Sequence, residues 1–321
     1  MSEAGGLVYL SDRVLDGLGI STADVVAAVE RAVLARTEER LWTAPKTAVM
    51  PGDGRYMMAT LAAADEPGVI VVKSVMVAPD NAARGLPGIN GAILILDSVT
   101  GVLKAVMDAN WVTAVRTAAL SAVVARRLAD PEAQSVAFVG CGVQAHSHLA
   151  AFAELFPLRE IRAVGRGRAK VDTLCDAARG LGLEAHALDA REALDGVDLV
   201  VSSITLDYSV APFLDARWLK PGAFATITDL AIPWEPAGMP AFDTVIIDDR
   251  VQEAESARPM VEPGLIAGDL TEMIGGRIAA GFAPDRRAAF VFRGLAVGDF
   301  ALAALAYESA VASGAGTRVA G

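Results

Sequence analysis

The sequence of 321 residues has few of the side chains that bind metal ions or form disulfide bonds. It contains three histidines and two cysteines, and Cys141 and Cys175 do not have a metal-ligand spacing. Two cysteines are too few for a disulfide framework. His146 and His148 are two positions apart in a predicted helix, so their side chains point to different sides of it. We therefore predict no catalytic metal, and two free thiols in a reducing compartment.

Long apolar runs and an excess of basic residues are also missing. No apolar run approaches the roughly eighteen residues that a membrane-spanning helix needs, and residues 1–6 are too few and too polar for a signal peptide. Acidic residues outnumber basic ones by 39 to 28, which argues against a nucleic-acid partner. The sequence thus predicts a cytoplasmic protein that binds neither membranes nor nucleic acid. Its 53% hydrophobic residues suffice for buried cores and a dimer interface.

A short apolar segment that runs into glycines organises the chain. Residues 136–139 are β-branched, aromatic or small, Gly140 and Gly142 follow, and apolar residues then recur at helical spacing. This pattern is typical of a strand, a tight turn and a helix. The first glycine permits the turn, and the second lets the backbone approach a pyrophosphate at the helix N-terminus. The pattern predicts a dinucleotide site at Gly140, Gly142, Val143, Gln144 and Ala145.

Further predicted strands favour a Rossmann domain. They lie at residues 160–165, 198–204, 224–229 and 244–248, with helical or turn-rich segments between them. A glycine pair also ends many strands that bind nothing, but strands that alternate with helices indicate a parallel sheet. The predicted fold class is α/β, with a Rossmann dinucleotide-binding domain over residues 133–288.

The rest of the chain is expected to form a discontinuous α+β domain, made of residues 1–132 and 289–321. After a first strand and two helices, strands are predicted at residues 47–50, 56–61, 69–77, 92–97 and 102–107. A long helix over 111–128 ends at Asp130-Pro131. A last strand at 289–292 and a helix at 297–313 do not extend the parallel sheet naturally. We therefore assign both to the first domain.

The end of the second Rossmann strand bears on the choice of cofactor. A carboxylate there accepts a hydrogen bond from the ribose of NAD, whereas arginine in its place accommodates the 2′-phosphate of NADP. Here the strand runs into Gly165-Arg166-Gly167-Arg168 without an acid. A solvated arginine turn is the alternative, but two guanidinium groups in an acidic protein favour NADP(H), with NAD(H) possible. We expect Arg166, Arg168 and, after a later strand, Thr205 to bind the cofactor.

Three basic residues outside this domain lie in unusual surroundings. Lys46 follows a proline at a strand start, Lys73 interrupts an apolar strand, and Arg116 lies in an apolar helix. A buried cation is costly unless it is paired. The three could bind a carboxylate, for which arginine supplies a planar fork and lysine a point charge. For Lys73 the alternative is a place at a sheet edge, or an ion pair with Asp97 or Asp108.

These motifs together resemble the ornithine cyclodeaminase/mu-crystallin family. The resemblance covers nearly the whole chain in the right order. It rests on Lys73, the segment Asn-Ala-Ala-Arg-Gly-Leu-Pro at 81–87, residues 96–101, the segment Thr-Ala-Val-Arg-Thr-Ala-Ala at 113–119, and residues 140–145 and 292–299. It implies a homodimer whose first domain carries both the substrate and the dimer contacts.

The resemblance also implies roles for single residues. Lys46, Lys73 and Arg116 match the positions that hold the substrate carboxylate, although Lys46 replaces an arginine and loses its bidentate geometry. Asp229 matches an aspartate near the nicotinamide and the substrate nitrogen, and Glu235 a glutamate six positions on. Between the two, Leu-Ala-Ile-Pro-Trp replaces the glycine- and lysine-containing loop common in cyclodeaminases. Asp229 and Lys73 are the candidate catalytic residues; for Asp229 a helix-cap or loop carboxylate is the alternative.

A nicotinamide, a carboxylate-binding site and one acid–base group are the requirements for hydride transfer at a carbon bearing nitrogen. NADPH would deliver hydride to an imine carboxylate while Asp229 supplies or orients the proton. We expect a ketimine or Δ1-pyrroline/piperideine-2-carboxylate reductase, or an amino-acid dehydrogenase. Two alternatives remain open. One is an NAD-dependent ornithine cyclodeaminase that forms proline and ammonia, and the other is a non-catalytic NADPH-dependent binding protein of mu-crystallin type.

Overall fold

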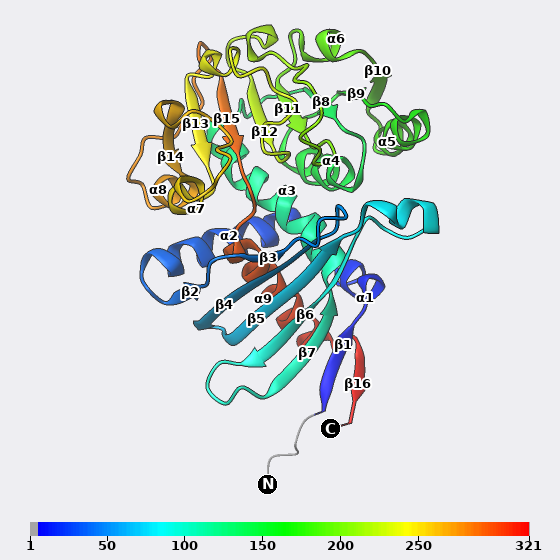
Figure 1. Ribbon diagram of the computed structural model, residues 1–321, viewed down its shortest axis with the longest axis vertical. Helices are drawn as coiled ribbons and strands as arrows, with labels where there is room; N and C mark the ends of the chain where they lie inside the picture. The colour runs from blue at the N-terminus through cyan, green and yellow to red at the C-terminus, as the bar shows by residue number, and fades with distance from the viewer. Residues whose placement is uncertain (1–5, 321) are drawn as a thin grey trace. The chain divides into compact units, whose positions relative to one another are not determined.

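The computed structural model describes residues 6–320, and the chain divides into two compact units (Figure 1). Unit 1 comprises Met1–Arg116 and Leu295–Gly321, and unit 2 comprises Thr117–Gly294. The first division falls inside helix α3 (Ala109–Leu128), not after it as the sequence suggested. The reason is that the second half of α3 packs in unit 2, where the hydroxyls of Ser121 and Thr226 are 2.7 Å apart.

Unit 1 is built on a mostly antiparallel sheet. Along the sheet the strands are ordered β16-β1-β7-β6-β5-β4-β2, β3 also pairs with β4, and β1 is parallel to β7. The strands are β1 (Leu7–Leu10), β2 (Leu41–Thr43), β3 (Thr47–Val49), β4 (Tyr56–Asp65), β5 (Gly68–Val77), β6 (Ile89–Asp97), β7 (Leu103–Asp108) and β16 (Thr317–Val319). The helical segments are α1 (Asp12–Asp16), α2 (Thr22–Thr37), the 3-10 helix η1 (Pro79–Arg84), the first part of α3, and α9 (Ala296–Ser313).

The two faces of this sheet differ in burial. Helix α9 packs against α2 and against β4, β5 and β6. Side chains that alternate along β5, from Val69 to Val75, are buried on one face, as expected for a strand with a period of two. On the other face, residues paired across five strands form an apolar row that stays half-buried or exposed: Leu61, Val72, Leu94, Val106 and Tyr9.

Unit 2 is built on an eight-stranded parallel sheet in the order β10-β9-β8-β11-β12-β15-β13-β14. The strands are β8 (Ser135–Val139), β9 (Glu160–Val164), β10 (Glu184–Ala187), β11 (Leu199–Ser202), β12 (Phe224–Ile227), β13 (Thr244–Ile247), β14 (Ile266–Asp269) and β15 (Ala288–Val291). The helical segments between them are α4 (Val143–Leu155), α5 (Arg168–Gly180), α6 (Ala190–Leu194), η2 (Ala216–Trp218), η3 (Met239–Ala241), α7 (Arg250–Ala254), η4 (Pro263–Leu265) and α8 (Leu270–Ile274). The strand order reverses between β8 and β11, and ligands of such sheets bind outside the carboxyl ends of the strands at this point.

One strand was assigned to the wrong domain. The sequence placed residues 289–292 in the first domain, but β15 lies inside the parallel sheet, between β12 and β13. All four of its residues are buried, which is typical of a central parallel strand covered on both faces. The chain returns to unit 1 only at Leu295, before α9. Within residues 6–320, no helix is both long enough and apolar enough to cross a membrane.

Candidate functional site

The glycine turn after β8 has the geometry that its sequence predicts. Gly140 has a φ of +94°, and a Cβ there would lie 2.6 Å from the carbonyl oxygen of Ser203. Gly142 is the N-cap residue of α4, and a Cβ there would meet no atom within 4 Å. No side chain of the described residues caps this helix. The backbone N–H groups of the first turn are therefore available to an anion.

Two side chains beside the glycines are buried. Ala145 packs in the core, and the Cys141 thiol lies 3.5 Å from the carbonyl oxygen of Val164. Burial raises the pKa of Cys141 to about 11, so the thiol stays protonated at neutral pH. Both cysteines are free. Gln144 lies in the first turn of α4, and Val143 before it is exposed.

The two arginines after β9 differ in their contacts. Arg168 begins α5 and donates from its Nε to Asp172, one turn later, at 3.0 Å. Arg166 lies exposed in the turn between β9 and α5. The hydroxyl and amide of Ser209 hold the pKa of Asp207 below its ordinary value, and the charge of Arg166 adds to this effect. Thr205 is exposed in the segment that follows β11.

Asp229 follows β12 and is fully buried. Its Oδ2 accepts hydrogen bonds from the Ser202 hydroxyl at 2.5 Å and from the Ile204 amide at 3.0 Å. Its Oδ1 has no hydrogen-bond partner among residues 6–320. Burial raises the pKa of Asp229 to about 6 and outweighs the hydrogen bonds, which lower it. This carboxyl group can therefore exchange a proton near neutral pH, as a general acid or base must.

The backbone after Asp229 is unusual. Leu230 and Ala231 have φ values of +59° and +57°, in the left-handed region that favours glycine. Such conformations persist in non-glycine residues only where the surrounding structure fixes them, and they cluster at functional sites. The unusual loop noted in the sequence is thus tightly turned here. Glu235, at its far end, is half-buried.

Unit 1 contains a second buried polar cluster, in which Lys73 and Arg116 meet Asp299. The Lys73 Nζ lies 2.6 Å from Asp299 Oδ1, and the Arg116 Nε lies 3.2 Å from the same oxygen. Thr60 donates to Asp299 Oδ2 at 3.0 Å. Lys73, Arg116 and Asp299 are 1%, 7% and 3% exposed, respectively. Burial lowers the pKa of Lys73 to about 8, although Asp299 favours its charged form.

Sequence reasoning missed the role of Asp299. It offered Asp97 or Asp108 as partners of Lys73, but Asp97 pairs with Lys104 at 2.8 Å. Asp108 accepts from the Asn110 amide. The signal for Asp299 was a carboxylate in the first turn of the otherwise apolar helix α9. Burial alone would raise its pKa, but the charges of Lys73 and Arg116 hold the pKa below its ordinary value.

The charges of this cluster do not cancel. Two cations and one anion leave a net positive charge in a buried setting, and such a charge is costly without a counter-ion. The Arg116 Nη1 has no hydrogen-bond partner in the described part of the chain. Lys46 lies half-buried between β2 and β3, and its charge contributes to the lowered pKa of Lys73. The cluster therefore carries an uncompensated positive charge and an arginine donor that could bind an anion.

The predicted residues thus gather at two places. Lys73 and Arg116 meet in unit 1, with Lys46 within electrostatic range of Lys73. In unit 2 the glycine turn and Asp229 are joined through the end of β11. The carbonyl of Ser203 lies against Gly140, while Ser202 and Ile204 donate to Asp229.

The sequence comparison decides the family. The model of the ornithine cyclodeaminase/mu-crystallin family matches residues 13–233. The chain belongs to this family. The resemblance stated from the sequence motifs is thereby confirmed.

Proteins of related sequence or fold include named enzymes. The ketimine reductase mu-crystallin of Mus musculus is 30% identical over 228 residues, which are 70% of this chain and 71% of that protein. The Δ1-pyrroline-2-carboxylate reductase of Thermococcus litoralis, solved with NADH and L-proline, superposes with a TM-score of 0.88 at 24% identity, over 98% of this chain and 100% of that one. An archaeal alanine dehydrogenase dimer with bound NAD superposes with a TM-score of 0.85 at 22% identity, over 98% of this chain and 99% of that one. The predicted α/β fold is confirmed.

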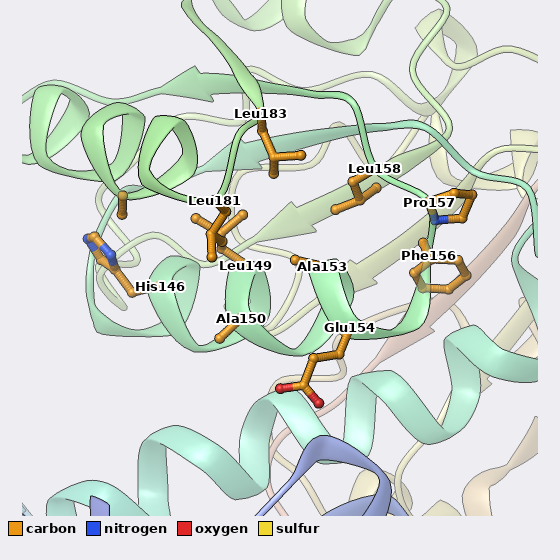
Figure 2. Close-up of a pocket in the computed structure, with 11 residues that line it drawn as sticks. His146, Leu149, Ala150, Ala153, Glu154, Phe156, Pro157, Leu158, Leu181 and Leu183 are labelled. Atoms are coloured by element: carbon orange, nitrogen blue, oxygen red, sulfur yellow. The ribbon is translucent and has the colours of Figure 1, made fainter.

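Two other features lie apart from these clusters. A hollow of about 580 Å³ beside α4 is lined mainly by leucine and alanine side chains (Figure 2), and none of its lining residues is a candidate site residue. Among the described residues, the carboxylates of Glu160 and Glu184 and the ring of His186 form one group with metal-ligand spacing. The carboxylate of Glu160 already forms an ion pair with Arg162, whose Nη2 lies 2.7 Å from Glu160 Oε1. The expectation of no catalytic metal remains a prediction.

The two turn glycines should respond differently to alanine. We expect Gly140→Ala to destabilise the protein by about 1–3 kcal/mol from its left-handed φ alone, and further through the clash with Ser203. Gly142→Ala should leave the melting temperature nearly unchanged, because its Cβ would face open space, and should weaken dinucleotide binding. Thermal melts and calorimetric titrations of both variants with NADPH and NADH would measure this. Unchanged dinucleotide affinity in Gly142→Ala would contradict the assignment of the turn.

Proposed function

We propose that this chain is an NAD(P)H-dependent oxidoreductase that acts on the C–N bond of a small α-imino or α-amino acid. The observation that carries the proposal is the buried cluster of Lys73, Arg116 and Asp299, which has a net positive charge and an arginine donor without a partner among residues 6–320. A carboxylate fits both properties, because it brings one negative charge and accepts hydrogen bonds from arginine. Relatives named ketimine reductase and Δ1-pyrroline-2-carboxylate reductase support this class of substrate.

The two units supply different parts of the proposed function. In unit 1, Lys73 and Arg116 bind the substrate carboxylate, with Lys46 adding positive charge, and Asp299 holds both cations in place. In unit 2, the turn from Gly140 to Ala145 binds the pyrophosphate of a nicotinamide dinucleotide. The open space at Gly142 and the uncapped start of α4 fit this group. The nicotinamide supplies or accepts the hydride.

Asp229 provides the proton. In the reductive direction its protonated carboxyl group donates to the substrate nitrogen, directly or through water. In the oxidative direction the carboxylate takes a proton from the substrate's ammonium group. Oδ2 is held by Ser202 and Ile204, which leaves Oδ1 for this exchange.

The first test is an assay of the purified protein with Δ1-pyrroline-2-carboxylate and Δ1-piperideine-2-carboxylate. We expect both to be reduced with loss of NADPH absorbance. Lys73→Met keeps the bulk of the side chain but leaves Arg116 and Asp299 as a neutral pair, so kcat/KM should fall by about thirtyfold or more. Dinucleotide affinity should not change. The control is Lys104→Met, which removes a lysine of the same sheet outside the cluster.

Other outcomes of this assay would replace the proposal. Ammonia release from L-ornithine without net change of the cofactor would indicate a cyclodeaminase. Tight dinucleotide binding, with no oxidation of NADPH or NADH by any cyclic imine or by keto acids with amines, would indicate a binding protein. Near-normal kcat/KM in Lys73→Met would refute the carboxylate-binding role.

The pH dependence should report Asp229. Because its pKa is raised to about 6, we expect the rate of reduction to fall as the pH rises through that value, as the proton donor is lost. The rate of the reverse oxidation should rise over the same range. Asp229→Asn should lower kcat by about two orders of magnitude and remove this ionisation. Profiles of kcat from pH 5 to 9 measure both effects.

A buried aspartate elsewhere serves as the control for this profile. Asp248 follows β13, its pKa is also raised to about 6 by burial, and it accepts from the amides of Arg293 and Gly294. In Asp248→Asn the pH profile of kcat should still show the ionisation near pH 6. A profile that loses the ionisation in Asp248→Asn, but keeps it in Asp229→Asn, would exclude the proposed role of Asp229.

For the cofactor we propose a preference for NADP(H). The support is the absence of an acid at the end of β9 and the exposed Arg166, whereas Arg168 is already paired with Asp172. Arg166→Gln should raise KM for NADPH by about tenfold, as expected for a lost hydrogen bond to a charged group, and leave KM for NADH unchanged. Arg168→Gln is the matched control. A wild-type KM for NADH at or below that for NADPH would contradict this preference.

We also propose that the protein is a homodimer and that the apolar row of unit 1 lies in its interface. A sheet face with a continuous apolar row is typical of a protein contact. The archaeal alanine dehydrogenase of the same fold, solved as a dimer, supports a second copy as the partner. Leu94→Glu should give a monomer in light scattering, because it places a charge in the middle of the row. Val99→Glu, in the exposed turn after β6, should stay a dimer; a monomeric wild type would reject the proposal.

A further inference from the structure

Three buried side chains in unit 2 form a series of hydrogen bonds that begins at the first turn of α4, next to the cofactor turn. His148, on α4, is fully buried, and its Nδ1 lies 2.7 Å from the carbonyl oxygen of Gln144. Its Nε2 lies 2.8 Å from the hydroxyl of Ser121 on α3. That hydroxyl is 2.7 Å from the hydroxyl of Thr226 on β12. All three side chains are nearly or fully buried.

The chemistry of the partners fixes the direction of these hydrogen bonds. A carbonyl oxygen only accepts, so the hydrogen of a neutral imidazole is on Nδ1 and Nε2 is an acceptor. Burial lowers the pKa of His148 to about 4, which keeps the ring neutral. Ser121 must then donate to Nε2, although the carbonyl of Thr117 lies 3.2 Å from the same hydroxyl. The Thr226 hydroxyl in turn donates to Ser121.

The ends of this series of hydrogen bonds lie on the two elements that carry the cofactor turn and Asp229. Gln144 belongs to the first turn of α4, which follows Gly142. Thr226 lies on the strand that leads, three residues later, to Asp229. Buried polar groups are costly unless all are satisfied, and a satisfied network fixes one arrangement of the elements it joins.

We propose that His148 is a positioning residue for the dinucleotide. Through Ser121 and Thr226 it holds the first turn of α4, and thereby the cofactor turn, in a fixed place relative to the strand that carries Asp229. The inference rests on the proposed function only in that the turn binds a nicotinamide dinucleotide. It assigns a role in cofactor affinity to a side chain that does not touch the cofactor.

The test compares affinity with stability in the full-length protein. His148→Phe removes both hydrogen bonds of the ring, and we expect Kd for NADPH and for NADH to rise by about fivefold or more. Thr226→Val, which removes only the last hydroxyl, should raise Kd in the same direction by less. Thr226→Ser keeps the hydroxyl and should restore the wild-type Kd. Calorimetric titration gives Kd, and a thermal melt of each variant gives its stability.

A core variant away from the cofactor turn distinguishes an effect on the position of the turn from a general loss of stability. Ile246→Ala, on β13, should lower the melting temperature without changing Kd. Values of Kd within twofold of wild type in His148→Phe and Thr226→Val, alongside a lowered melting temperature, would overturn the inference. If His148→Phe does not fold, the comparison of Thr226→Val with Thr226→Ser decides. A wild type that binds dinucleotides but reduces no imine would refute the proposed reaction and leave this inference standing.

Discussion

The carboxylate of Asp299 is the group on which the polar interior of unit 1 depends. Lys73 interrupts a buried strand and Arg116 lies in a buried helix, and neither charge is tolerable there without a partner. Asp299 binds both and is itself held by Thr60. One anion does not balance two cations, so the cluster is stable enough to fold and still attracts an additional negative charge. The same residues thus account for the fold of this unit and for its proposed specificity for carboxylates.

In unit 2 a comparable role falls to the end of β11. Three successive residues there, from Ser202 to Ile204, contact both the cofactor turn and the acid–base group Asp229. The carbonyl of Ser203 lies so close to Gly140 that a Cβ at position 140 would clash with it. Its neighbours Ser202 and Ile204 donate hydrogen bonds to Asp229. A displacement of this short segment would therefore affect the cofactor turn and the acid–base group together. Burial raises the pKa of Asp229, and its Oδ1 has no partner in the described part of the chain; its proposed role needs both properties.

Much of this arrangement could be predicted from local sequence patterns. The strand, glycine turn and helix around Gly140 are specified by neighbouring residues, and the parallel sheet follows from the alternation of strands and helices. Lys73 and Arg116 were recognisable because a charge in an apolar segment requires an explanation. The signals at Gly140, Lys73 and Arg116 each lie within a few residues of the feature they predict.

The rest depended on contacts between distant segments. The sequence assigned β15 to the wrong domain because its four residues do not show which sheet they join. Asp299 was overlooked because it lies more than two hundred residues from Lys73, and nearer acids such as Asp97 were equally plausible partners. The hydrogen bonds of His148 were invisible for the same reason, since they join α3, α4 and β12.

The discontinuity of unit 1 has a consequence for the order in which the protein can fold during synthesis. Unit 2 is one uninterrupted segment, Thr117–Gly294, and all of its strands are synthesised before α9. Unit 1 lacks α9, and with it Asp299, until residues 296–313 are translated. Until then Lys73 and Arg116 lack the Asp299 carboxylate, so burying their charges within unit 1 is costly. Translation therefore favours completion of the dinucleotide-binding unit first, with the carboxylate-binding cluster assembled last.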